Sequence, residues 1–310
     1  MSLQVINPGF CTLVQDFGRF GKQKYGFTNG GPMDEHAFLW ANKLLGNNYN
    51  CSQLEICMGG FSAEFLKETI ISVCGADGKV TLNNHVISSW QTHRVKSGDV
   101  IRIDGFVKGL YSYLAIQNGF QIDSQLGSCS TVMREKLGGT SQNGTPLQSK
   151  AELNYQANSQ YFSSIIPNEY NPNIEDKVIL RFIPNTSETG CHDSAIQSFI
   201  EQTYTVGSEI NRMGYRLKGK KIKIENEGII SQGIGLGTIQ LPKDGQPIVL
   251  MKDRQTIGGY PQLGCVAYLD LSKLSQSKPG TKINFQIAEI DQITEELNAY
   301  LDFFEIQYCS

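Results

Sequence analysis

Short apolar segments recur along the chain and are separated by Gly, Asn, Asp or Pro. Each segment is rich in β-branched or aromatic residues, which is typical of β-strands. The segments cover residues 69–76, 79–87, 98–106 and 109–116 in the first half, and residues 177–184, 220–225, 237–242, 246–251, 265–271 and 282–290 in the second. The pattern predicts a mainly β chain with a few short helices.

Three stretches have apolar residues at spacings of three and four, which indicates amphipathic helices. They cover residues 32–47, 192–202 and 288–304. Gly46 is placed to end the first helix, and Asp193 is placed to cap the second. The apolar stripes are expected to face a protein core.

The chain length of 310 residues favours two domains. Residues 138–161 are polar and poor in strand signal, so they are predicted to form a long loop that leads to a linker, or alternatively a mobile lid. Similar turn-and-strand patterns at residues 95–103 and 277–285 suggest two related β lobes. We therefore expect domains at residues 1–165 and 166–310, with an approximate boundary and with exchange of segments allowed.

Charge and cysteine usage exclude several classes of function. Lys and Arg number 27 against 30 for Asp and Glu, which provides no attraction for nucleic acid or an anionic membrane. No apolar run approaches the roughly 18 residues of a membrane span, and no secretory leader is recognisable. The eight cysteines form no CxxC pair and the four histidines show no metal spacing. We expect a cytoplasmic protein with reduced cysteines and no metal.

Residues 240–264 hold the highest density of chemically useful side chains. The amides of Gln246 and Gln255 can both donate and accept hydrogen bonds, and Asp253 can accept or act as a base. Gly258 and Gly259 allow close approach of a ligand or a neighbouring strand. This mixture suits a small amide, which displays one C=O and one N–H. The alternative is a polar hairpin whose side chains cap its own turns.

Two further segments have polar clusters. In residues 208–219, Arg212 and Arg216 could hold a carboxylate or phosphate through paired N–H groups, and Tyr215 could stack or donate. The alternative is an irregular strand pair with exposed arginines. In residues 127–139, Cys129 has no histidine base nearby in the sequence, so no nucleophilic role is assigned to it.

Several long motifs occur in the order seen in one protein family. They are QDFGR at 15–19, GPMDEHAFLWANKLLGN at 31–47, YLAIQNGF at 113–120, GSCST at 127–131, NRMGYRL at 211–217 and DGQPIVLMKDRQTIGGYP at 244–261. Together they resemble the family of C-type 5-oxoprolinase subunits, also called KipA or allophanate hydrolase subunit 2, and the last two motifs are most similar to the 5-oxoprolinase branch. The resemblance implies two cyclophilin-like β-barrel lobes. It also implies ATP-dependent opening of 5-oxo-L-proline to L-glutamate by a complex that includes a B-type (KipI-like) and an A-type subunit.

The chemistry of a lactam that bears a carboxylate suggests roles for individual residues. Ring closure is favoured over the open chain, so ring opening must be coupled to ATP hydrolysis in the assembled complex; no ATP site is recognisable in this chain. The catalytic residues are expected to be Asp253, Gln255 and Tyr260. Further substrate contacts are expected from Arg212 as a carboxylate clamp, Tyr215, Gln246, Thr256, Gly258 and Gly259.

Two other functions stay open at this point. The first is carboxyl transfer to urea or a related amide from carboxybiotin on a partner, although the chain itself lacks a biotin-attachment Met-Lys-Met motif. The second is KipA-like regulation through binding of a KipI-like kinase inhibitor. One departure from the family pattern is residues 184–187, Pro-Asn-Thr-Ser, where a Gly-Pro-Gln/Glu stretch is common.

Overall fold

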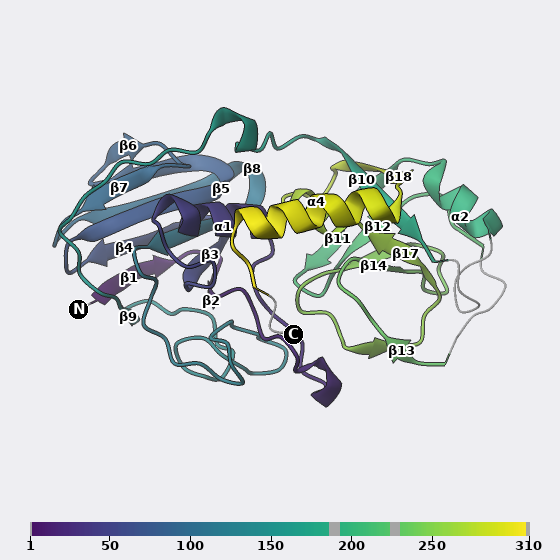
Figure 1. Ribbon diagram of the computed structural model, residues 1–310, viewed down its shortest axis with the longest axis horizontal. Helices are drawn as coiled ribbons and strands as arrows, with labels where there is room; N and C mark the ends of the chain where they lie inside the picture. Colours follow the sequence, from purple (N-terminus) through teal and green to yellow (C-terminus); the bar gives the residue numbers. More distant parts are fainter. Residues whose placement is uncertain (1, 186–192, 224–229, 308–310) are drawn as a thin grey trace. The chain divides into compact units, whose positions relative to one another are not determined.

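The computed structural model describes residues 2–185, 193–223 and 230–307, and it divides the chain into two compact units (Figure 1). The first unit comprises Met1–Phe20 and Asn29–Ile174. The second comprises Gly21–Thr28 and Glu175–Ser310. The first unit thus extends beyond the expected boundary at residue 165, and one short N-terminal segment packs with the second unit.

A nine-stranded sheet forms the first unit, with the strand order β2-β3-β8-β4-β1-β9 and with β5 pairing β6, β7 and β8. The strands are β1 (Ser2–Pro8), β2 (Cys11–Gln15), β3 (Gln53–Cys57), β4 (Phe61–Phe65), β5 (Thr69–Leu82), β6 (His85–Ile87), β7 (Thr92–Val95), β8 (Val100–Ile116) and β9 (Glu152–Asn154). The unit also contains α1 (Glu35–Leu44) and the 3-10 turn η2 (Asn168–Tyr170).

Strands β5 and β8 are longer than the sequence pattern predicts. The segments 69–76 and 79–82 belong to one strand, and 100–106 and 109–116 belong to another. The pairing between them shifts register around Gly75, Asp77 and Gly78. A β-bulge bends a strand without ending it, so these glycine-rich positions curve the sheet where the sequence suggested turns.

Helix α1 and the long polar stretch both behave as parts of the first unit. Asp34 caps α1 by accepting from Ala37 N at 3.1 Å, and Gly46 has φ +64° just beyond the helix, as predicted. Within residues 138–161, strand β9 pairs with β1, and Leu153 and Tyr155 are buried. This burial anchors the segment to the sheet, which differs from the alternative of a mobile lid.

A closed seven-stranded barrel forms the second unit, in the order β10-β17-β14-β15-β12-β11-β18. The strands are β10 (Lys177–Pro184), β11 (Tyr204–Asn211), β12 (Gly214–Lys218), β14 (Thr238–Gln240), β15 (Ile248–Leu250), β17 (Gln262–Val266) and β18 (Lys282–Ile287). Strands β13 (Gln232–Gly233) and β16 (Ile257–Gly258) form a separate two-stranded ribbon. The unit also contains η1 (Gln23–Tyr25), α2 (Asp193–Ile200), η3 (Tyr268–Asp270), α3 (Leu271–Ser275) and α4 (Ile290–Phe303).

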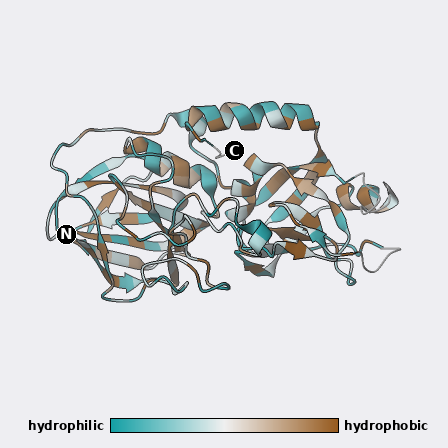
Figure 2. Cartoon of the chain, turned by 60° about the horizontal axis from the view of Figure 1, so that its bottom comes forward, coloured by the Kyte–Doolittle hydropathy of each residue, from teal (hydrophilic) through white to brown (hydrophobic). Residues whose placement is uncertain are grey.

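Aromatic side chains fill part of the second unit's core. The ring of Phe199, from α2, lies 4.3 Å from that of Phe285 and 5.1 Å from that of Phe182. Helix α4 contributes less to the core than its apolar stripe predicts, because Ile293 is buried whereas Ile290 is 60% exposed. Figure 2 shows α4 coloured largely as hydrophilic.

Two expected strands differ in the structure. Strand β17 ends at Val266, where a 3-10 turn and α3 replace the predicted strand over 265–271. Residues 220–223 form no strand, and the rest of the predicted strand at 220–225 lies outside the described residues. Two other expectations also fall outside the described part of the chain, namely the capping side chain of Asp193 and the family departure at residues 186–187.

The prediction of a mainly β chain with two β units is confirmed. Within the described residues the first unit is an open, bent sheet, and the second is a closed barrel.

Candidate functional site

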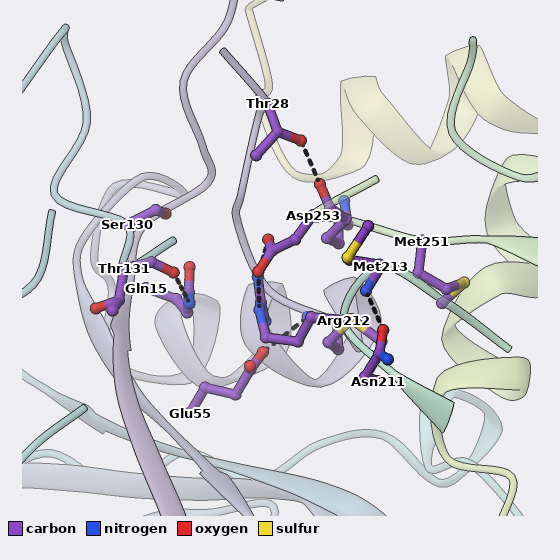
Figure 3. Close-up of polar contacts among 12 residues, drawn as sticks. Gln15, Thr28, Glu55, Ser130, Thr131, Asn211, Arg212, Met213, Met251 and Asp253 are labelled. Carbon is purple, nitrogen blue, oxygen red and sulfur yellow. Dashed lines mark hydrogen bonds and ion pairs between the residues drawn. The ribbon is translucent and has the colours of Figure 1, made fainter. Parts of the chain in front are cut away.

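The tip of the β11–β12 hairpin holds a buried ion pair. Arg212 and Met213 form the two-residue turn between Asn211 and Gly214, and Asn211 Oδ1 accepts from Met213 N at 2.8 Å. Arg212 Nε donates to Asp253 Oδ2 at 2.8 Å and Nη2 donates to Oδ1 at 2.9 Å (Figure 3). The side chains are 7% and 5% exposed. The two-bond geometry is the strongest arrangement available to an arginine and a carboxylate.

This ion pair changes the role expected for Arg212. The carboxylate that the guanidinium holds is Asp253 of the same chain, so this edge of the guanidinium is not open to a substrate carboxylate. The backbone reinforces the pairing, because Asp253 N donates to Arg212 O at 2.7 Å. Lys252 O, in the residue before Asp253, accepts from Thr28 Oγ1 at 3.1 Å. The pair therefore fixes the start of the polar segment 252–260.

The structure places Tyr215 and Gln246 away from this segment. Tyr215 is fully buried, and its hydroxyl donates to Ser275 O at 2.7 Å. The structure therefore places it in the core, and not at the substrate contact that was expected of it. The amide of Gln246 bonds to the backbone N and O of Gly219. Gly219 and Arg212 flank opposite ends of β12, a strand of five residues that spans roughly 13 Å. Gln246 therefore caps a turn, as the structural alternative for this segment anticipated.

A second polar cluster lies where the β13–β16 ribbon meets strand β14. A Cβ atom on Gly258 would lie 2.8 Å from Gln240 Nε2 and 3.6 Å from Gln255 Nε2. Gln262 is the cross-strand partner of Gln240. Gln240 is 2% exposed, and among the described residues neither its Nε2 nor that of Gln262 has a hydrogen-bond partner. We call Gln240, Gln255, Gln262 and Arg254 the donor cluster.

Arg254 is the cationic member of the donor cluster. It is 4% exposed, and among the described residues its guanidinium donates to two backbone carbonyls, Ile234 O at 3.3 Å and Met251 O at 3.4 Å. Burial lowers the pKa of Arg254 to about 10, because a charged group loses its hydration inside the protein. Asp253, its neighbour in sequence, is paired with Arg212. In the described part of the chain, no carboxylate forms an ion pair with Arg254.

The remaining expected residues lie along the same segment. Thr256 O accepts from Ile234 N at 3.0 Å, which holds the segment against β13. Gly259 is half-buried and Tyr260 is 43% exposed. The structure thus brings Gln255 and Gly258 together with Gln240, pairs Asp253 with Arg212, and leaves Tyr260 at the surface.

The sequence pattern does not single out Gln240 or Gln262 as functional residues. Each glutamine lies in a short strand whose neighbours, Ile239 and Leu263, are fully buried in the barrel. A glutamine that alternates with core residues along a strand normally faces water. Here the β13–β16 ribbon covers that face, and a contact between distant segments leaves no signal in the strand itself.

The family motifs of the first unit form buried polar networks. Asp16, from QDFGR, accepts from Ser130 Oγ at 2.6 Å and from Cys129 N at 2.7 Å, both in GSCST. Burial, followed by the nearby charge of Asp16, raises the pKa of Cys129 well above its ordinary value. A thiol that stays protonated is a poor nucleophile, which agrees with assigning no such role to Cys129.

A second network in the first unit involves Glu55 and Tyr113. Glu55 Oε2 accepts from Tyr113 Oη at 2.8 Å and from Met33 N at 2.7 Å, and Asp34 N donates to Tyr113 Oη at 2.8 Å. Burial and the nearby charge of Glu55 raise the pKa of Tyr113 well above its ordinary value. These bonds position the residues that lead into α1.

The described residues contain neither a metal site nor a membrane-spanning helix. No set of three or more His, Cys, Asp or Glu residues in the described ranges is arranged to hold a metal ion. Among the helices that the structure describes, none is both long and apolar enough to cross a membrane.

Comparison with known proteins defines the class of the chain. Residues 25–287 match the family described as carboxyltransferase domain, subdomain A and B, and the chain therefore belongs to this family. The chain is similar to the C-type subunit of 5-oxoprolinase from Haemophilus influenzae, with 31% identity over 93% of both chains. It is also similar to the protein of the same name from Escherichia coli, with 29% identity over 98% of this chain and 96% of the relative.

Solved structures support the same class. The urea amidolyase of K. lactis matches with a TM-score of 0.89 and 27% identity over the whole of this chain. The chain spans only 20% of that much longer protein. A Kluyveromyces lactis urea carboxylase structure matches equally well, with the chain spanning 30% of its length.

Proposed function

We propose that this chain is the C-type subunit of a heteromeric ATP-dependent 5-oxoprolinase, which opens 5-oxo-L-proline to L-glutamate. The observation that carries the proposal is the similarity to two C-type 5-oxoprolinase subunits across nearly the full length of all three chains. The expected partners are an A-type and a B-type (KipI-like) subunit. The proposal places the complex in the cytoplasm, where ATP is available.

The reaction defines what the protein must supply. Ring opening breaks the amide C–N bond, adds water at the carbonyl carbon and leaves the ring nitrogen as the amine of glutamate. ATP hydrolysis to ADP and phosphate in the complex supplies the free energy. The substrate presents acceptors at its carbonyl and carboxylate, and one N–H donor. Segment 252–260 offers matching groups in Gln255, Thr256 and Tyr260, on a backbone fixed by the Arg212–Asp253 ion pair.

Asp253 and Tyr260 remain proposed catalytic residues of segment 252–260, in roles that fit the observed geometry. Asp253 would act through its hold on Arg212 or as an acceptor for the lactam N–H. Tyr260, at 43% exposure, would contact the substrate from the open side. Gly258 and Gly259 would let the backbone approach the ligand.

The direct test is coexpression with candidate A-type and B-type partners, followed by assay of 5-oxoproline-dependent release of phosphate and glutamate. Turnover that requires all three proteins supports the proposal. Gln255→Ala should reduce kcat/KM by about tenfold or more, the usual loss when a positioned polar contact is removed. Gln197→Ala on α2, an exposed amide in the same unit, is the matched control and should leave turnover unchanged. A complete complex without turnover would refute the proposal.

A second candidate function is carboxyl transfer from carboxybiotin on a partner to a small amide. The match of the whole chain to the urea amidolyase and urea carboxylase structures favours it. Incubation of the chain with a biotin carboxylase partner, bicarbonate, ATP and urea distinguishes the two functions. Urea-dependent phosphate release without any response to 5-oxoproline would favour carboxyl transfer.

A further inference from the structure

The donor cluster has an unbalanced set of hydrogen-bonding groups. Gln240 Nε2 and Gln262 Nε2 are enclosed in the second unit without an acceptor among the described residues. Buried polar groups in folded proteins almost always have partners, so an enclosed donor without one points to a missing ligand or solvent molecule. Gln255 Nε2 approaches the same point beside Gly258. The amide groups of Gln240 and Gln255 therefore lie together beside Gly258, and Gln262 is the cross-strand partner of Gln240.

The positive charge of Arg254 indicates which kind of ligand the donor cluster could bind. Arg254 is a buried cation, and the groups that accept from it in the described ranges are the carbonyls of Ile234 and Met251, at 3.3 and 3.4 Å. Ile234 links it to the amides, because the space beside Gly258 is bounded by both Ile234 Cδ1 and Gln240 Nε2. One buried positive charge near amide N–H donors is best balanced by a monoanion with several acceptor oxygens. A carboxylate has this chemistry.

We propose that Gln240, Gln255, Gln262 and Arg254 bind the carboxylate of a small organic acid beneath the β13–β16 ribbon. Naming that acid as 5-oxoproline, or as its product glutamate, rests on the proposed function. The carboxylate recognition itself does not.

The ribbon provides the route of entry. It is a separate two-stranded sheet with two paired positions, Gln232 with Gly258 and Gly233 with Ile257. A pair of strands this short is only marginally stable in water, so it can lift from the barrel at small cost. Glycine at position 258 lets the ribbon lie close to the amides, because a Cβ there would come within 2.5 Å of Ile234 Cδ1 and 2.8 Å of Gln240 Nε2, and these two side-chain ends would have to move.

A titration of the full-length chain tests the proposal, using calorimetry and the side-chain amide signals of ¹⁵N-labelled protein. The ligands are 5-oxoproline, glutamate, acetate, orthophosphate and 2-pyrrolidinone, the same lactam without its carboxylate. At least one carboxylic acid should bind at least tenfold more tightly than 2-pyrrolidinone and shift the amide signals of Gln240 and Gln262. The titration is repeated on the assembled complex. Equal binding of 2-pyrrolidinone, tighter binding of orthophosphate, or no binding of any acid in either form would overturn the proposal.

Substitutions separate recognition from folding. Gln240→Met keeps the side-chain length but removes the enclosed donor, so it should weaken acid binding at least tenfold while raising the thermal midpoint. Arg254→Met, as a second variant, should abolish binding. Gln197→Met is the control and should bind normally. Unchanged acid affinity in a folded Gln240→Met protein would overturn the site.

The outcomes also separate this site from the proposed function. If the chain binds carboxylic acids through these residues but the fully assembled complex has no 5-oxoprolinase activity, the site stands and the proposed function fails. If the complex is active and Gln240→Met leaves both the KM for 5-oxoproline and the binding of every carboxylic acid tested unchanged, the proposed function stands and the site fails.

Discussion

The buried Arg212–Asp253 ion pair makes Asp253→Asn the most informative single substitution. Removing the carboxylate charge would take from the guanidinium of Arg212, whose side chain is 7% exposed, the anionic group that accepts two of its hydrogen bonds. Breaking a buried pair in this way costs about 4 kcal/mol. For a domain of this size each kcal/mol corresponds to about 3 °C, so the Tm of the second unit should fall by about 12 °C.

Scanning calorimetry of the purified chain measures this effect, and two further variants interpret it. The double variant Arg212→Met with Asp253→Leu should lie within about 2 kcal/mol of the parent, because both charges of this pair are removed together. Asp244→Asn breaks the pair of Arg216 with a carboxylate whose side chain is 43% exposed, and it should cost less than about 1 kcal/mol.

If the Tm of Asp253→Asn falls by less than about 2 °C, the claim that the two side chains depend on each other is refuted. Such a change is far below the drop in Tm expected for a broken buried pair. The same variants clarify the mechanism, since loss of turnover in Asp253→Asn alone could reflect a disturbed fold. Full turnover of the reconstituted complex with the double variant would remove Asp253 from the chemistry. Loss of turnover in a stable double variant would show that the carboxylate acts on the substrate.

Three other predictions concern separate parts of the chain. Burial opposes the charged form of Asp270, but hydrogen bonds from Arg181 and Lys273 together outweigh it and lower the pKa of Asp270. The stability that Asp270 contributes is therefore present above about pH 4 and is lost as the pH falls through the lower folded-state value, and urea unfolding at pH 3 and pH 6 should show less acid dependence in Asp270→Asn than in the parent. Gly258→Ala should weaken carboxylate binding about tenfold, because its Cβ would overlap Gln240 Nε2, and calorimetric titration checks this. Cys129 should react with iodoacetamide at pH 8 at least a hundredfold more slowly in the folded protein than in urea, because burial raises its pKa, and mass spectrometry of the labelled peptide checks this.

Much of the secondary structure could be predicted from local patterns. Helices α1 and α4 follow apolar spacings of three and four, and the cap at Asp34 and the glycine at 46 mark the ends of α1. Strands were recognisable from β-branched and aromatic residues. Their lengths were not, because the glycines near residue 77 permit either a turn or a bulge, and the partner strand β8 selects the bulge.

The candidate site was only partly predictable. The segment around Asp253 and Gln255 was identified from its density of polar groups, but three of its expected members behave differently in the structure. Tyr215 is a core residue, Gln246 caps a turn, and Arg212 holds a carboxylate of its own chain. Side-chain chemistry indicates which interactions are possible, whereas the fold selects the partner among several chemically suitable ones.

The sequence by itself determined the class of the chain, its β-rich character and the position of its most polar segment, because these depend on residue type and short-range spacing. Only the tertiary structure decided that one unit closes into a barrel and that Gln240, the cross-strand partner of Gln262, lies with Gln255 beside Gly258. The physical reason is that closure of the barrel and covering by the ribbon join segments far apart in sequence. Burial then removes these donors from contact with water, and the local sequence pattern does not indicate which side chains are buried in this way.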